Sequence, residues 1–176
     1  MLRRLSPGFA LVVGLVLAIA IAGTSSAAAS KFRSFGTGTV TLNRTGAHLV
    51  NGPGEYSGIY LRSRGSANWV KSVHMSFDYS GSVAGGAPRF SIPLDTNRDR
   101  VVDGYAFLDA QNCGDTGTVS TDDNDCKVFL NFSSDWFANW DALVAAHPNW
   151  RIPPRSIPFV IADQPGNYTV SNVDLR

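Results

Sequence analysis

The sequence predicts a mainly β protein made of antiparallel sheets, with one short α-helix. Short segments of alternating apolar and polar residues are separated by Gly, Pro, Asn and Asp, as in sandwiches and barrels. Thirteen of the 14 acidic residues are Asp, which favours turns and caps over helix interiors. The clearest alternation runs from Val73 to Tyr79, and the segment from Phe90 to Leu94 repeats it. Because each strand has one apolar and one polar side, we expect antiparallel sheets with one buried face.

Nine segments are predicted as strands. They are Gly38–Asn43, Ala47–Val50, Gly58–Ser63, Val70–Tyr79, Arg89–Leu94, Gly104–Asp109, Lys127–Phe132, Pro158–Ala162 and Tyr168–Leu175.

One helix is predicted, from Asp135 to Ala146. Ser134 is a suitable N-cap, and Pro148 ends the helical pattern. Helical spacing puts Trp136, Phe137, Trp140, Leu143 and Val144 on one side, which favours packing of this side onto a sheet. The alternative interpretation is a sugar-binding platform, which requires at least one of the two Trp rings to be exposed.

The N-terminus has the organisation of a secretory signal peptide. Arg3 and Arg4 precede an apolar run from Phe9 to Ala22, and Ala27–Ala29 supplies a small-residue cleavage site. The apolar run is shorter than the roughly 20 residues of a membrane span, although an uncleaved anchor remains the alternative. We therefore expect residues 1–29 to be removed and residues 30–176 to form a single secreted domain, monomeric and free of the membrane.

The charge of the expected mature chain excludes one class of partner. All 14 acidic residues lie after position 29, and they nearly balance the basic residues there. A near-neutral chain has no electrostatic reason to bind nucleic acid or an anionic membrane.

The two cysteines, Cys113 and Cys126, are predicted to form a disulfide, because an even count in an exported chain indicates a bridge. Closing this ring is worth about 3 kcal/mol on the chain-entropy model. The polar residues of the ring predict an excursion outside the core.

The segment from Asp95 to Asp103 has the spacing of a calcium loop. Side-chain oxygens recur at alternate positions, and the position that interrupts them can contribute its backbone carbonyl. The alternative is an Asp- and Asn-rich turn without metal. Oxygen ligands favour Ca²⁺ over Zn²⁺ or Cu²⁺. The predicted ligands are Asp95, Asn97, Asp99 and Asp103 through their side chains and Val101 through its carbonyl.

This loop resembles the calcium loops of dockerins and of thrombospondin type 3 repeats. The resemblance covers nine residues and implies the same ligand set. Arg100 stands where those loops usually carry Gly, and Ala106 stands where an EF-hand carries its bidentate acid.

The closing segment, Tyr168–Leu175, resembles the last strand of jelly-roll carbohydrate-binding modules. This resemblance implies an antiparallel jelly-roll-like β-sandwich, and in such modules the strand is structural. The block from Gly85 to Leu175 also resembles secreted bacterial proteins to which no function is assigned.

No catalytic motif is present in the sequence: Gly-x-Ser-x-Gly, His-Glu-x-x-His and the P-loop are all absent. His48, His74 and His147 are far apart, and Glu55 is the only Glu. We therefore expect a Ca²⁺-stabilised, non-catalytic module that binds extracellular or cell-wall carbohydrate. A glycan-active hydrolase or lyase and a structural cell-surface protein are the alternatives. The predicted ligand-binding rings are Trp150, Trp69, Tyr60 and Tyr56, because sugar faces stack on exposed aromatic rings.

Overall fold

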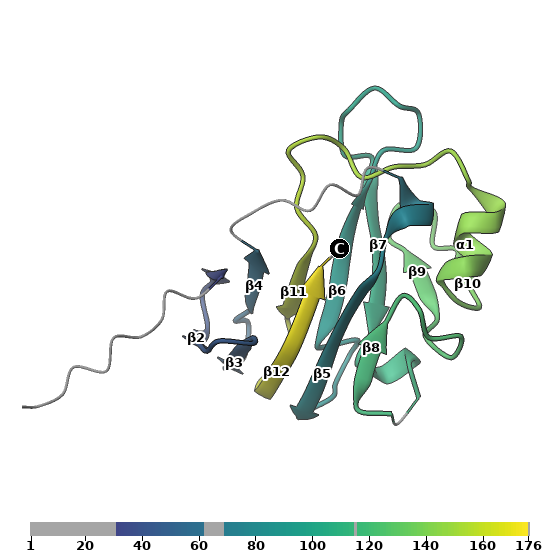
Figure 1. Cartoon of the computed structure of the whole chain (residues 1–176). Helices are drawn as coiled ribbons and strands as arrows, with labels where there is room; N and C mark the ends of the chain where they lie inside the picture. The colour runs from purple at the N-terminus through teal and green to yellow at the C-terminus, as the bar shows by residue number, and fades with distance from the viewer. Residues whose placement is uncertain (1–30, 62–68, 115, 176) are drawn as a thin grey trace, which may run out of the picture.

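A computed structural model describes residues 31–61, 69–114 and 116–175. The predicted signal peptide, residues 1–29, lies outside the described residues. The described part forms two antiparallel sheets that enclose one core, which confirms the predicted β-sandwich. In Figure 1 strands β5 and β12 lie side by side in front of the larger sheet, and the helix α1 lies at one edge. Within the described residues, no helix is long and apolar enough to cross a membrane.

The larger sheet has the strand order β1-β4-β11-β6-β7-β9-β10. Its strands are β1 (Phe32–Gly36), β4 (Ser57–Leu61), β6 (Arg89–Leu94), β7 (Gly104–Asp109), β9 (Val128–Leu130), β10 (Trp136–Phe137) and β11 (Phe159–Ala162).

The smaller sheet has the order β2-β3-β12-β5-β8. Its strands are β2 (Thr39–Leu42), β3 (Ala47–Asn51), β5 (Met75–Gly81), β8 (Thr118–Ser120) and β12 (Gly166–Leu175). The helices are η1 (Val70–Ser72), η2 (Ala110–Asn112) and α1 (Trp140–Ala146).

The core lies between the two sheets and is filled by alternate residues of each strand. Phe77 of β5 meets Phe90 of β6 edge to face, with ring centroids 4.7 Å apart, so the contact joins the two sheets. Both rings are fully buried, as are Ile92 and Leu94 further along β6. The predicted alternation in these two strands is therefore confirmed.

The predicted strands match with a few differences. The bounds of β6 and β7 agree residue for residue, while Lys127–Phe132 shortens to β9. Val70–Tyr79 is wrong in its first half, because Val70–Ser72 forms a 3-10 turn and β5 begins at Met75. The end of Gly58–Ser63 lies outside the described residues. Three short strands, β1, β8 and β10, were not predicted.

The predicted helix Asp135–Ala146 is wrong in its first five residues. The observed helix starts at Trp140, and its N-cap is Asn139, whose side chain accepts a hydrogen bond from Ala142 N at 2.9 Å. Trp136 instead lies in β10, paired with Phe129 of β9. Pairing with a neighbouring strand outweighs the local helical pattern here. As a result Trp136 is 53% exposed, whereas Trp140 is buried and donates its Nε1–H to Val70 O.

The disulfide between Cys113 and Cys126 is confirmed. Both residues are buried, and the ring they close carries β8, the edge strand of the smaller sheet, which pairs with β5. The ring is therefore more than a polar excursion, because Val119 at the centre of β8 lies in the core.

Candidate functional site: an aromatic sheet face

The outward side of the larger sheet carries aromatic side chains on six of its seven strands. The register places all of them on the side opposite the core, because they alternate with buried residues such as Ile59, Ala106 and Leu108. We call this set the aromatic face. Its members are Phe35, Tyr60, Tyr105, Phe107, Phe129, Trp136 and Phe159.

The rings of the aromatic face form one continuous row. Phe35 contacts Tyr60 and Phe159, with ring centroids 6.0 and 5.3 Å apart. Tyr105 contacts Phe159 at 5.8 Å across strand β6, where the small side chains of Ser91 and Pro93 lie between them. The row continues from Tyr105 to Phe107 at 6.4 Å, to Phe129 at 6.2 Å and to Trp136 at a further 4.9 Å.

Small residues make room for this row. A Cβ atom on Gly58 would lie 2.4 Å from the ring of Phe35, so the ring rests directly on the backbone of the neighbouring strand. The row crosses the sheet from β1 to β10, six strand spacings or about 29 Å. Its dimension therefore suits an elongated ligand.

A groove lies at the β10 end of the row. Two adjoining cavities of about 390 Å³ each share Asn112 and Trp136 in their lining. Phe107 and Phe129 line one of them, and Trp136 is the most exposed ring of the row. The groove thus combines an aromatic floor with polar walls. Its remaining lining residues are Gly85, Gly86, Arg89, Asp109, Lys127, Phe137, Ala138 and Asp163.

The polar walls are held in place by the protein itself. Arg89 makes a two-fold ion pair with Asp163, with both N–O distances 2.6 Å, and its guanidinium lies 4.6 Å from the ring centroid of Phe107. Asp109 accepts hydrogen bonds from the backbone and the side-chain amide of Asn112. Arg89 Nε is buried and has no hydrogen-bond partner among the described residues. A buried donor without a partner costs free energy.

Of the four predicted ligand-binding rings, only Tyr60 belongs to the aromatic face. Tyr56 is 43% exposed in the segment that precedes β4. Trp69 is 37% exposed and lies beside the 95–103 loop, where the guanidinium of Arg98 covers its ring at 5.8 Å. Trp150 is half-buried and stacks on His147 with ring centroids 3.7 Å apart. The structure therefore distributes the predicted rings over separate places.

Sequence reasoning missed most of the aromatic face. In β7 the residues of both phases are apolar, Tyr105 and Phe107 in one and Ala106 and Leu108 in the other. When both sets of alternate residues are apolar, the alternation does not show which set faces the core. The sequence does show rings at alternate positions in several strands. That these rings lie on the outward side of one sheet can be inferred only when the order of the strands is known.

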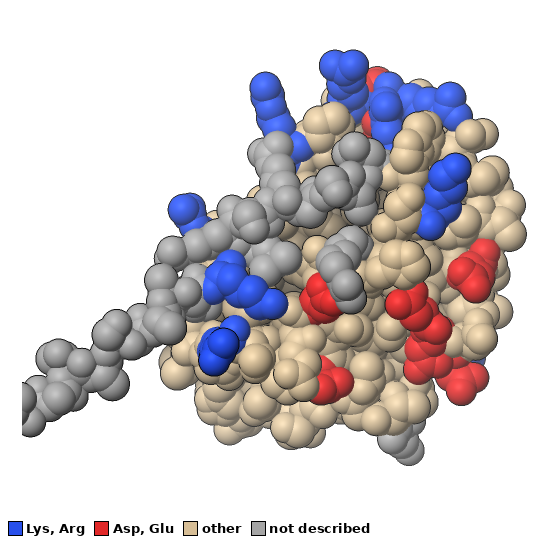
Figure 2. Space-filling model, viewed as in Figure 1, with Lys and Arg blue, Asp and Glu red and all other residues tan. Residues whose placement is uncertain are grey.

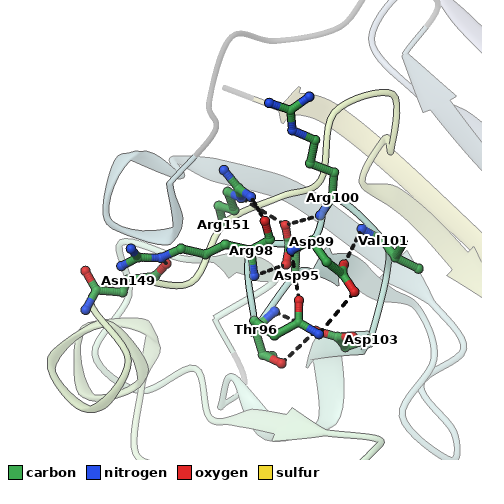
Figure 3. Close-up of polar contacts among 10 residues, drawn as sticks. Asp95, Thr96, Arg98, Asp99, Arg100, Val101, Asp103, Asn149 and Arg151 are labelled. Carbon is green, nitrogen blue, oxygen red and sulfur yellow. Dashed lines mark hydrogen bonds and ion pairs between the residues drawn. The ribbon is translucent and has the colours of Figure 1, made fainter.

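The predicted calcium loop between β6 and β7 is organised around the buried carboxylate of Asp95 (Figure 3). Asp95 accepts hydrogen bonds from the backbone N–H groups of Arg98 and Arg100. Arg151 donates its Nε–H to Asp95 Oδ2 at 2.9 Å and also hydrogen-bonds to Arg98 O. Burial alone would raise the pKa of Asp95, but these hydrogen bonds and the charge of Arg151 hold it below its ordinary value.

The other predicted ligands of the loop also accept hydrogen bonds from the protein. Asn97 Oδ1 accepts from Asp99 N at 2.9 Å, and Asp99 Oδ1 accepts from Val101 N at 2.8 Å. Asp103 Oδ2 accepts from the hydroxyl and N–H groups of Thr96, which lowers the pKa of Asp103. These are the hydrogen bonds of Asx turns.

The predicted calcium ligands do not converge on one point. Among residues 31–61, 69–114 and 116–175, no three or more His, Cys, Asp or Glu side chains are placed to share a metal ion. The guanidinium of Arg151 lies against Asp95, the first ligand of the predicted set, and neutralises it. As arranged, the residues do not form a calcium site, and Ca²⁺ binding stays a prediction.

The backbone of this loop is strained at two arginines. Arg98 has φ 70° and Arg100 has φ 74°, in the left-handed region that favours glycine. Such a conformation costs an ordinary residue about 1–2 kcal/mol. The hydrogen bonds from both N–H groups to Asp95 offset this cost.

His48, His74 and Glu55 form polar contacts outside the groove. His74 pairs with Asp122 at 2.8 Å, with both side chains 62% exposed, and His48 bonds to Asn167. Glu55 accepts a hydrogen bond from Gly52 N in its own turn. None of these residues lines the groove.

Comparisons of this chain with protein-family models, with curated proteins and with solved structures found no match. The functional argument therefore depends on the geometry of the aromatic face.

Proposed function

We propose that this protein is a secreted, non-catalytic binding module for extracellular or cell-wall carbohydrate, and that the aromatic face is its binding surface. The observation that carries the proposal is the continuous row of partly exposed rings that ends at Trp136 in a groove. Pyranose rings have flat C–H faces that stack on aromatic rings.

The polar groups of the groove support a neutral sugar as the ligand. Arg89 and Asp163 neutralise each other, and their planar groups can donate to and accept from hydroxyls of a sugar stacked on the rings. Ligand pockets commonly combine such apolar floors with a few fixed polar groups.

A glycan-active hydrolase is a second candidate, because Asp109 and Asp163 line the same groove and glycosidases use two carboxylates. Both are committed to structural partners, Asp163 to Arg89 and Asp109 to Asn112. This arrangement favours fixed walls over a proton donor and a nucleophile, so we place binding before hydrolysis.

The experiment is a pull-down of the secreted protein with insoluble cellulose, chitin, xylan and peptidoglycan. Retention on at least one of them is expected, with little dependence on salt because the chain is nearly neutral. Soluble reducing ends that appear over time would instead support the hydrolase. Retention on none of the four would favour the structural cell-surface alternative.

Trp136→Ala should abolish retention, and Tyr56→Ala is the matched control. Both rings are exposed, at 53% and 43%, but Tyr56 lies off the aromatic face. Equal loss in both variants would contradict the assignment of the surface.

A further inference from the structure

We propose a second binding site at the loop end of the sandwich, which takes the carboxylate-bearing sugar residue of an anionic glycan. The site is a pocket of about 260 Å³ lined by Trp69, Arg100, Arg151, Ile152 and Pro154. Its volume suits one sugar residue, because larger ligands occupy pockets of about 300–1,000 Å³. The proposal goes beyond the aromatic face and does not rest on it.

The charge of the pocket favours an anion. Among the residues that the structure describes, its lining contains two arginines and no carboxylate. Arg151 is fixed by its hydrogen bonds to Asp95 and Arg98 O. Figure 2 shows Lys and Arg side chains gathered at the end of the molecule where Figure 1 draws the loop between β6 and β7.

Arg100 is the free cation of the pocket. Its guanidinium makes no hydrogen bond or ion pair with any of the residues the structure describes, and Figure 3 shows the side chain leading away from the Asp95 cluster. A guanidinium presents parallel N–H groups that match the two oxygens of a carboxylate. Arg100 is therefore suited to hold the carboxylate of a ligand.

Arg100 occupies a position whose backbone favours a different residue. At φ 74° glycine would be unstrained, yet the chain carries arginine. Strain of this kind is typical of functional sites, where the side chain gained outweighs its cost. The observed outlier thus points to a use for the guanidinium.

Trp69 supplies the surface for the sugar ring, on the face of the indole opposite the guanidinium of Arg98. It is 37% exposed, and its backbone forms a β-bridge with Arg151, which fixes it beside the loop. A ring next to a free guanidinium matches a pyranose that bears a carboxylate. Two sources share this chemistry, the uronates of acidic polysaccharides and the muramic acid residues of peptidoglycan that carry no stem peptide and so keep a free carboxylate.

The test uses the mature chain in a Trp136→Ala background, so that the aromatic face does not contribute. Trigalacturonate, N-acetylmuramic acid with its free lactyl carboxylate, and neutral cellotriose are titrated by calorimetry. Binding of one or both acidic ligands, but not of cellotriose, is expected, and the ligand that binds identifies the source. Absence of binding by both acidic ligands, or equal binding of cellotriose, would overturn the proposal.

Arg100→Gly is the informative variant, because glycine adopts the φ of this position freely and the loop should keep its fold. Affinity should fall at least tenfold without a lower melting temperature, and Arg44→Ala, on the exposed β2–β3 turn, should leave affinity unchanged. Trp69→Ala should also weaken binding at least tenfold. Unchanged affinity in either Arg100→Gly or Trp69→Ala would refute the site.

Discussion

The two outward faces of this sandwich are built on the same alternation but carry opposite chemistry. On the smaller sheet almost every outward position is a hydroxyl, amide or carboxylate side chain, as expected for a face in water. These positions are Thr39, Thr41, His48, Val50, Ser76, Asp78, Ser80, Thr118, Ser120, Asn167, Thr169, Ser171 and Asp174.

The larger sheet carries the aromatic face at the equivalent positions. The core between the sheets is formed by inner residues of both sheets, such as Leu49 and Phe77 of one and Ile59 and Phe90 of the other, so the outward rings are not part of it. Contiguous apolar surface of this kind marks an interaction site more often than a structural need. The difference between the faces therefore indicates which one meets a ligand.

The largest expected effect separates the inner side of the larger sheet from its outer side. Phe90→Ala removes a fully buried ring that contacts Phe77, and should lower the free energy of unfolding by about 3–5 kcal/mol. Trp136→Ala removes a ring that is 53% exposed and should cost about 1 kcal/mol or less. Urea denaturation measures both. Similar losses would mean that the aromatic face is structural.

The disulfide offers a way to disturb the polar-faced sheet alone. Cys113→Ala/Cys126→Ala opens the ring that carries β8 and should cost about 3 kcal/mol, with faster hydrogen exchange in β8. Polysaccharide retention should persist, because Phe129 and Trp136 pair with each other outside the ring. Loss of retention in a folded double variant would show that the two faces are coupled.

A calcium titration tests whether the loop between β6 and β7 binds a cation other than the guanidinium of Arg151. The sequence predicts that Ca²⁺ raises the melting temperature and EDTA lowers it. At a hundredfold excess of Ca²⁺ over Kd, binding to the folded state would add about 2.7 kcal/mol to the free energy of unfolding. Asp99→Ala should then remove the shift, whereas Asp174→Ala should not. Identical melts in both buffers would leave Arg151 as the cation that neutralises Asp95.

The smallest effects are those of pH, and they arise from groups off both faces. Burial lowers the pKa of His147, so the unfolded chain takes up its proton first and stability should fall slightly below about pH 6.5. The lowered pKa values of Asp95 and Asp103 stabilise the fold above about pH 3.8, and this contribution is lost as pH falls through their folded values. Urea titrations at several pH values should give two separate declines. Stability that rises on acidification through either range would contradict these assignments.

Much of the fold could be predicted because the strongest strands alternate clearly. In β6 one phase is Phe90, Ile92 and Leu94, so both the bounds and the buried side follow from the sequence. The jelly-roll connectivity remains a prediction. The start of α1 could not be predicted, because Trp136 fits the helical period and only its pairing with β9 assigns it to a strand.

The candidate sites were less predictable for the same reason. Recognition of the aromatic face requires the order of strands that are distant in sequence, such as β11 beside β6. The ion pair between Asp95 and Arg151 joins residues 56 positions apart. The spacing of the loop therefore indicated that its carboxylates face a cation, but not that this cation is an arginine from a distant segment. The spacing of residues within one segment therefore predicted the local geometry of that segment well, but not which distant residues contact it.

The central claim is that the aromatic face is the ligand-binding surface. It is tested most directly by one substitution on each of the two outward faces. Polysaccharide retention should be measured for Trp136→Ser, which makes the aromatic face resemble the polar one, and for Thr169→Ala on the polar face. We predict that Trp136→Ser reduces retention at least tenfold, about 1.4 kcal/mol, and that Thr169→Ala leaves it unchanged. Retention that survives in Trp136→Ser and is lost in Thr169→Ala would contradict the account.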